Sequence, residues 1–192
     1  MEIRQLNTES ILIKGKKEVV LVNPSEDKVK KYENARVVIF TDKKKDFLGL
    51  GTEKVVISGP GEYEVGGIEI NGLNGSNGDV IYVMNVDGVR VGVLGNLSET
   101  LSEKKVSKVN DLDVLVIGVA NKEKISHKHI WDWGKKWGTN YVLPFGVEQD
   151  SEDMKSFLDV ADREDLEKMD SLKVDKDNLP EGTEVVILSI SK

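Results

Sequence analysis

The chain has 192 residues, two histidines, no cysteine and a formal net charge of −7. This length is enough to bury one well-formed core, and it favours a single domain spanning residues 1–192. The absence of cysteine excludes disulfides, thiolate metal sites and cysteine nucleophiles, and two histidines are too few for an imidazole-rich dinuclear zinc centre. The acidic balance argues against a nucleic-acid-binding domain, which needs a net basic surface.

The first residues do not show the basic and then apolar pattern of a signal peptide. No apolar run approaches the roughly 18 residues that a membrane-spanning helix needs. We therefore expect a soluble, cytoplasmic protein that does not associate with membranes.

The first 95 residues contain short apolar runs, mostly β-branched, which are separated by turn-forming residues. Two pairs of runs meet across two-residue turns, Gly66-Gly67 and Asp87-Gly88, and these pairs predict hairpins. The segment 71–79 (NGLNGSNGD) is the richest in turn-forming residues, and we expect it to be an exposed connection between strands. Strands are expected at residues 11–13, 19–22, 36–40, 54–57, 62–65, 68–70, 80–86 and 89–94.

From Leu97 onward the spacing of apolar residues changes. The leucines and valines between Leu97 and Val109 predict a helix with Ser98 as its N-cap. The continuous apolar run 114–117 is typical of a strand buried on both faces. The other elements expected are a strand at 141–143 stopped by Pro144, a polar helix at roughly 151–169 and a strand at 185–188. Together these elements predict an α/β domain with a β-rich first half.

Another helix is predicted to begin after Ser126 and to end near Gly138. Its buried face would carry Ile130, Trp133 and Trp137, which are spaced at i, i+3 and i+7. Large aromatic residues on such a face usually belong to the core.

The start of this helix holds both histidines of the chain. His127 and His129 are two positions apart, so on a helix they point to nearly opposite sides and cannot bind one metal ion. We expect both to face the solvent. Trp131 lies off the apolar face and is the better candidate for a contact with a ligand or partner.

A run of three lysines, Lys43-Lys44-Lys45, lies between Asp42 and Asp46 directly after a predicted strand. Charged runs of this kind are usually solvated loops. The alternative is a patch that attracts anions or contacts a partner, because sites in α/β proteins often lie at the carboxyl ends of strands.

The order of these elements resembles the metallo-β-lactamase fold, in the branch of small, lactonase-like Zn-dependent hydrolases. The resemblance covers nearly the whole chain and implies a four-layer αββα sandwich in the α/β (α+β) class, with two mixed β-sheets flanked by helices. The segments that carry it are the Asp-x-Lys-x-Asp-Phe loop at 42–47, VISGPGEYEVGG at 56–67, residues 81–83 and 86–90, Gly95-Asn96-Leu97, Leu143-Pro144-Phe145-Gly146 and LPEGTEVV at 179–186.

The metal-binding motif of that family is replaced at almost every position that can be placed. The family's His-x-His-x-Asp-His loop falls on residues 42–47, where only Asp46 matches and Lys44 occupies a ligand position. The family's bridging aspartate falls on Asn96, and its late histidine falls on Gly146. The resemblance therefore implies the scaffold of a zinc hydrolase without its imidazole ligands.

Charge makes a zinc site improbable at these positions. Zinc needs three or four close nitrogen, sulfur or carboxylate ligands to activate water. An ammonium such as that of Lys44 in a ligand position would repel a dication by several kcal/mol, on the order of 4 kcal/mol per unit charge pair at about 4 Å. We therefore expect no zinc, no other cofactor and no catalytic residues, only a vestigial pocket formed by Asp42, Lys44, Asp46 and Asn96.

The first functional hypothesis is a non-catalytic relative of these hydrolases with a binding or structural role, in which Lys44 pairs with Asp42 or Asp46. The alternative is a hydrolase of a lactone or phosphoester. It would use Asp42 and Asp46 as base or ligands and Lys44 for the developing oxyanion, with or without Mg²⁺ or Mn²⁺ held by Asp42, Asp46 and Asn96. A third hypothesis is a homo-oligomeric or protein-binding scaffold that uses the Trp131 side or a sheet edge; the sequence names no partner.

Overall fold

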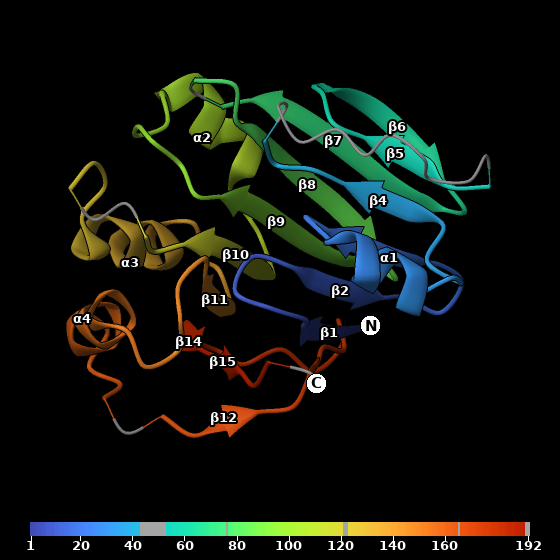
Figure 1. Ribbon diagram of the computed structural model, residues 1–192. Helices are drawn as coiled ribbons and strands as arrows, with labels where there is room; N and C mark the ends of the chain where they lie inside the picture. Colours follow the sequence, from blue (N-terminus) through green and yellow to red (C-terminus); the bar gives the residue numbers. More distant parts are fainter. Residues whose placement is uncertain (43–52, 76, 121–122, 165, 191–192) are drawn as a thin grey trace.

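The computed structural model describes residues 1–42, 53–75, 77–120, 123–164 and 166–190. Two mixed β-sheets lie face to face, and helices pack on the outer face of each (Figure 1). The α/β class, the two mixed sheets and the αββα layers implied by the resemblance are confirmed. None of the helices in these ranges has the length and apolar character needed to cross a membrane.

The first sheet is built from the N-terminal part of the chain and closed by one short late strand. Its strand order is β13-β1-β2-β3-β4-β5, antiparallel up to β3 and parallel from β3 to β5. The strands are β1 (Glu2–Gln5), β2 (Ile11–Lys14), β3 (Val19–Val22), β4 (Val37–Ile39), β5 (Val55–Ile57) and β13 (Leu172–Lys173).

The second sheet has the order β14-β11-β10-β9-β8-β7-β6 and is antiparallel from β6 to β9 and parallel from β9 to β14. Its strands are β6 (Gly61–Val65), β7 (Ile68–Asn74), β8 (Val80–Val86), β9 (Val89–Gly95), β10 (Val114–Gly118), β11 (Tyr141–Phe145) and β14 (Glu184–Val185). Two further short strands, β12 (Lys168–Met169) and β15 (Ile187–Leu188), pair in parallel.

Both predicted two-residue hairpins are confirmed. The β8–β9 turn places Asp87 at φ 54° and Gly88 at φ 82°, which is the left-handed geometry that a type I′ turn requires. The β6–β7 turn likewise has positive φ at Gly66 and Gly67. These turns fix the register of the antiparallel half of the second sheet.

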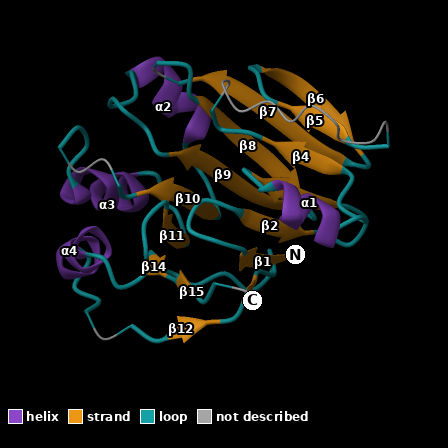
Figure 2. Ribbon diagram, viewed as in Figure 1, coloured by secondary structure: helices purple, strands orange, loops and turns teal. Residues whose placement is uncertain are grey.

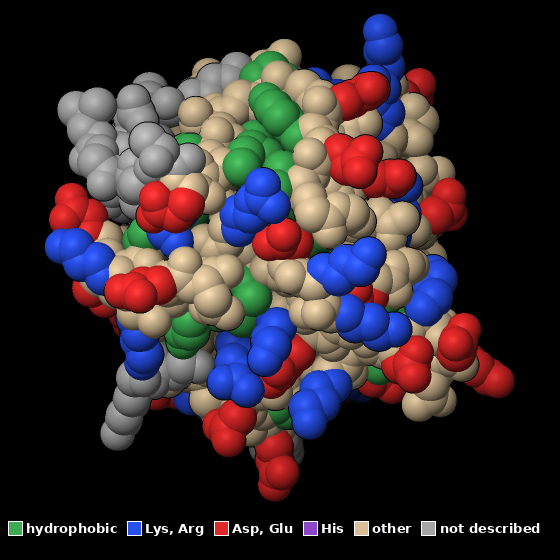
Figure 3. Space-filling view, turned by 90° about the vertical axis from the view of Figure 1, so that its right-hand side faces the viewer, with side chains coloured by type: hydrophobic (Ala, Val, Ile, Leu, Met, Phe, Trp, Pro, Cys, Tyr) green, Lys and Arg blue, Asp and Glu red, His purple; other side chains and the backbone are tan. Residues whose placement is uncertain are grey.

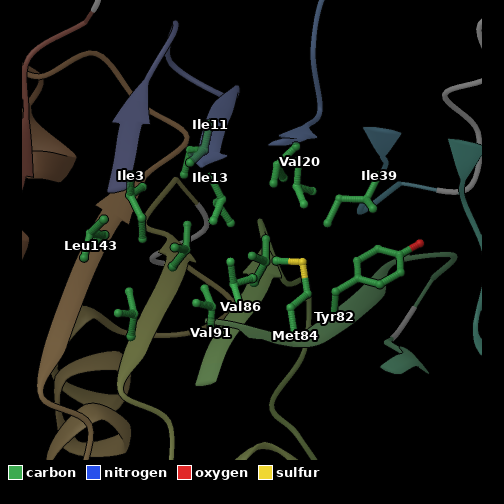
Figure 4. Packing of buried hydrophobic residues seen from close by; sticks show 14 of the residues in the cluster. Ile3, Ile11, Ile13, Val20, Ile39, Tyr82, Met84, Val86, Val91 and Leu143 are labelled. Carbon is green, nitrogen blue, oxygen red and sulfur yellow. The ribbon is translucent and has the colours of Figure 1, made fainter. Parts of the chain in front are cut away.

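The main core lies between the two sheets. Side chains of Ile3, Ile13 and Ile39 from the first sheet face Tyr82 and Met84 from the second (Figure 4). Alternate residues of the same strands point outward, so that Leu12 of β2 joins a second cluster on the outer face. The continuous apolar runs of β3, β4 and β10 thus arise because these strands are buried on both faces, whereas β6 and β7 alternate between more buried and exposed residues.

The helices cover the outer faces of the two sheets (Figure 2). The first sheet is covered by α1 (Glu26–Lys31), whose Val29 is buried, and the sequence did not predict this six-residue helix. The second sheet is covered by α2 (Glu103–Val109), α3 (His127–Lys136) and α4 (Glu152–Val160). Ser126 caps α3 by accepting a hydrogen bond from the His129 N–H, as expected from the sequence.

Two predicted helices have different bounds in the structure. The helix expected from Leu97 begins only at Glu103 and has Ser102 as its N-cap, because the Ser98 side chain is engaged by the β7–β8 turn. The polar helix expected to reach residue 169 ends at Val160, and Asp162 at φ 57° turns the chain out of the helix. Its expected last residues form β12 instead.

Two strand predictions need correction as well. Pro144 does not stop the strand expected at 141–143, because β11 continues to Phe145. The neighbouring β14 pairs with β11 only at Tyr141 and Val142. A proline beyond these two residues therefore removes no hydrogen bond between β11 and β14. The segment 71–79 is not a loop throughout, since β7 continues to Asn74 between β6 and β8. Here the pairing of the neighbouring strands overrides the local preference for turns.

His127 does not face the solvent as the sequence suggested. Its side chain is 4 % exposed, its Nε2 lies 3.0 Å from the Val119 carbonyl oxygen, and its Nδ1 lies 3.1 Å from the Ser156 hydroxyl. The ring therefore ties the start of α3 to the segment after β10 and to α4. His129 is exposed, and Trp133 and Trp137 are buried, as predicted.

Candidate functional site

The carboxyl ends of neighbouring strands converge at one edge of the sandwich. Asn96 follows β9, Gly118 ends β10 and Gly146 follows β11, and these three strands are adjacent and parallel. Thr41 and Asp42 follow β4 of the first sheet, next to Asp79 at the start of β8. Ligand sites of α/β sheets usually lie at such an edge.

The Asn96 side chain fills the space between two glycines. A Cβ atom added at Gly146 would lie 2.8 Å from Asn96 Nδ2 and closer still to Oδ1. A Cβ atom added at Gly118 would lie 2.6 Å from Asn96 Cγ and 2.8 Å from its Cα. Gly146 also has φ 86°, a conformation that favours glycine. A side chain at position 146, to which the resemblance assigns a histidine, therefore requires Asn96 to move.

Thr41 joins the two sheets beside this site. It is 7 % exposed, its hydroxyl accepts a 2.8 Å hydrogen bond from Asn23 Nδ2, and its N–H donates to Asn23 Oδ1 at 2.9 Å. The Thr41 carbonyl oxygen accepts from the Val80 N–H at 2.7 Å. Its side chain also packs on Gly95, where a Cβ atom would lie 2.8 Å from the Thr41 hydroxyl oxygen. The position of Asp42 is fixed by this network.

Asp42 and Asp79 form an antiparallel bridge between the ends of β4 and β8. Burial raises the pKa of the Asp79 carboxyl above its ordinary value of 3.8, and the charge of Asp42 raises it as well. Hydrogen bonds from Ser98 act in the opposite direction. The site thus contains a carboxyl group that holds its proton more firmly than an exposed aspartate does.

Replacing Asp79 by asparagine is expected to raise the free energy of unfolding at neutral pH. A carboxyl whose pKa is higher in the folded protein than in the unfolded chain stabilises the fold below its unfolded pKa and loses that contribution as pH rises through the folded pKa. Asparagine keeps an oxygen that accepts from Ser98 and carries no charge. The gain should disappear well below pH 3.8.

Urea denaturation of the Asp79→Asn variant at neutral and acidic pH measures this difference. Asp170→Asn, on an exposed residue, is the matched control and should change stability little at either pH. A variant less stable than the parent at neutral pH would contradict the prediction.

Of the four residues of the predicted pocket, Asp42 follows β4 and Asn96 follows β9 at this edge, and Lys44 and Asp46 lie outside the described residues, so the pocket stays a prediction. Asp79 was not predicted as a site residue. Its position follows from the predicted hairpin 80–86/89–94, because the register of that hairpin, continued past its open end, places Asp79 opposite Asn96.

The described residues do not fit the zinc centre that the family resemblance implies. In this part of the chain no group of three or more histidine, cysteine, aspartate or glutamate side chains is placed to hold a metal ion. At the site edge the donors are the carboxylates of Asp42 and Asp79 and the amide of Asn96. The buried His127 uses both ring nitrogens in contacts elsewhere.

The face of the molecule that includes β4, β5 and β6 carries acidic and basic side chains side by side (Figure 3). A narrow strip of hydrophobic side chains lies among them, and Val56 of β5 is 39 % exposed. Trp131, the candidate for an external contact, is half-buried on α3, and the Lys135 ammonium lies 5.4 Å from the centre of its ring. On this face the described charged side chains are of both signs, so they do not form a broad surface of one charge.

The αββα sandwich, with a polar cluster at the carboxyl ends of its strands, is the architecture of metallo-β-lactamase-type proteins. The family model of the β-lactamase superfamily domain matches residues 2–145, and the chain belongs to this superfamily. A comparison with curated proteins finds no significant match.

Solved structures with the same fold include a protein from Thermotoga maritima, described as a Zn-dependent hydrolase of the metallo-β-lactamase superfamily. It is 21 % identical with a TM-score of 0.78, and the alignment covers 98 % of both chains. The metallo-β-lactamase-fold protein YhfI from Bacillus subtilis is 10 % identical with a TM-score of 0.63, over 83 % of this chain and 92 % of that one. Zn²⁺-bound PqqB from Methylobacterium extorquens is 10 % identical with a TM-score of 0.58, and the alignment covers 93 % of this chain and 83 % of that one. At these identities the similarity shows the fold.

Proposed function

We propose that this chain is a non-catalytic member of the superfamily, which has lost its zinc ligands and acts through binding or a structural role. The observation that carries the proposal is the packing of Asn96 between Gly118 and Gly146. The side chain that stands at the family's bridging-aspartate position is a neutral amide, and it fills the space that a histidine at position 146 would need.

The charges around this position point the same way. Zinc sites are built from histidine, cysteine and carboxylate ligands held at short distances. The described edge offers two carboxylates, and burial raises the pKa of the Asp79 carboxyl, which disfavours the charged form that binds metal ions. The packing of Asn96 against the two glycines therefore supports a chain that keeps the fold of the superfamily without its zinc chemistry.

Zinc loading tests this proposal. The protein is purified without metal, incubated with zinc, desalted and measured by elemental analysis. We expect much less than one zinc per chain, because fewer than three suitable ligands converge among the residues that the structure describes. Tight binding of one zinc per chain would overturn the proposal. Denaturation curves with and without zinc supply a second readout, since a ligand bound by the native state raises stability.

The neighbouring carboxyls support one other candidate function, a hydrolase of a lactone or phosphoester. A carboxyl with a raised pKa beside a second carboxyl is a pattern that general acid–base pairs share, and Asp79 lies beside Asp42 in this way. In this candidate Asp79 would donate a proton to the leaving group and Asp42 would act as the base or hold Mg²⁺ or Mn²⁺.

A panel of lactones and phosphodiesters, assayed with Mg²⁺ or Mn²⁺, distinguishes the two functions. The parent is compared with Asp42→Asn, Asp79→Asn and Asp46→Ala. A non-catalytic protein gives the same background rate in all four. A parent rate that falls at least about 100-fold in the aspartate variants, the loss typical of a general acid or base, would establish the hydrolase.

A further inference from the structure

The segment from the middle of β7 to the start of β8 contains three Asn-Gly pairs, Asn71-Gly72, Asn74-Gly75 and Asn77-Gly78. Asparagine followed by glycine is the sequence most prone to spontaneous deamidation, because glycine has no side chain to hinder attack of its backbone nitrogen on the asparagine amide. The three pairs share this local chemistry, so any difference in their reactivity must come from the fold.

The fold protects the first two pairs. Asn71 and Gly72 lie within β7, which is paired with β6 on one side and β8 on the other, and Gly72 is buried. Gly75 follows the end of β7, and its N–H donates a 2.8 Å hydrogen bond to the Asp79 carbonyl oxygen. In both pairs the glycine nitrogen is held by the sheet or its end, and attack needs a local opening.

The third pair lies in the turn itself. Asn77 is exposed at φ 54°, and Gly78 is at φ 95° with open space where a Cβ atom would be. Among the described residues, no hydrogen bond engages the Gly78 N–H. The Asn77 amide nitrogen donates one 3.0 Å hydrogen bond, to the Ser98 hydroxyl. Only a side-chain contact at the surface therefore restrains the reacting groups.

We propose that Asn77 is a modification site, at which the folded protein converts asparagine to aspartate and isoaspartate without an enzyme. The Gly78 nitrogen forms a bond to Asn77 Cγ, the bond from Cγ to Nδ2 breaks, and ammonia leaves with the proton from the Gly78 N–H. Water then opens the resulting succinimide at either carbonyl and leaves a carboxylate.

The conversion changes the edge of the candidate site. It replaces the amide that donates to Ser98 with a carboxylate, and isoaspartate adds a methylene to the backbone two residues before Asp79. Ser98 also contacts Asp79. A new negative charge is thereby placed near the carboxyls of Asp42 and Asp79, at the end of β7 and the start of β8.

Peptide mapping by mass spectrometry tests the proposal. The full chain is incubated folded at mildly alkaline pH, and a parallel sample is incubated in urea. In the folded sample we expect conversion at Asn77 to be roughly ten-fold or more faster than at Asn74 and Asn71, which need local opening. In urea the three rates should converge, because only the fold distinguishes them.

The Asn77→Gln variant is the matched control, since its longer side chain retains the amide but closes the ring far more slowly. It should leave residue 77 unconverted and lower the thermal unfolding midpoint only slightly, because glutamine tolerates φ 54° less well than asparagine does. Conversion of Asn74 or Asn71 in the folded protein at a rate equal to that of Asn77 would overturn the proposal. The proposal would also be overturned if Asn77 stayed intact in the folded sample while all three pairs were converted in urea.

Discussion

Replacing Gly146 by alanine is expected to lower the free energy of unfolding by about 2–4 kcal/mol, because two penalties add at this position. The new Cβ would lie 2.8 Å from Asn96 Nδ2 and closer to Oδ1, and the residue must keep φ 86°. Chemical denaturation of parent and variant measures the change.

Two further variants separate these penalties. Gly138 has φ 66° and no atom within 4 Å of an added Cβ. Gly138→Ala therefore introduces backbone strain without a steric overlap and should lower the free energy of unfolding by about 1 kcal/mol. The double variant Gly146→Ala/Asn96→Ala should recover about 1–3 kcal/mol relative to additivity, since the overlap is removed. Strict additivity would show that Asn96 does not occupy the space beside Gly146.

The largest effect on stability is expected at the interface between α3 and α4. Phe157 of α4 is fully buried and meets the His127 ring edge-on at 6.1 Å between centroids. Phe157→Ala should cost about 3–5 kcal/mol, because it removes a large buried side chain and leaves a cavity under both helices.

The neighbouring Leu158 provides the control for this prediction. It is only partly buried on the same helix, so Leu158→Ala should cost clearly less than Phe157→Ala in the same urea titration. Equal losses at the two positions would mean that α4 is not packed against the sheet through the Phe157 face.

Most strands could be predicted from the sequence because their signals are local. The apolar run at 114–117 predicted a strand buried on both faces, and Asp87-Gly88 predicted a hairpin. Both are present in the structure. The layered architecture came from the resemblance rather than from periodicity. Helix α1 was missed because six residues with one buried side chain carry almost no periodic signal.

The errors arose where distant partners decide the local structure. Pro144 stays in a strand because β14 pairs with β11 only at Tyr141 and Val142. His127 is buried because Val119 and Ser156, which are remote in sequence, both reach its ring. A pattern read along the chain contains neither contact.

The candidate site was predicted in part for the same reason. Asn96 followed from the resemblance, but its packing against Gly118 and Gly146 depends on three parallel strands ending together. Asp79 was missed because it is an ordinary turn residue until the β4 and β8 ends meet. The resemblance to the family assigned Asn96 to the predicted pocket, and the fold determines which side chains lie beside Asn96 and Asp79.

We propose that the zinc site of the superfamily is lost in this chain and that the Asn96 side chain fills its place. Crystals of the protein soaked in zinc, with anomalous differences measured at the zinc absorption edge, test this proposal. We predict no anomalous peak near Asp42, Asp79 and Asn96, with Asn96 still packed between the two glycines. A fully occupied zinc at that position, coordinated by these side chains, would show that the zinc site is retained.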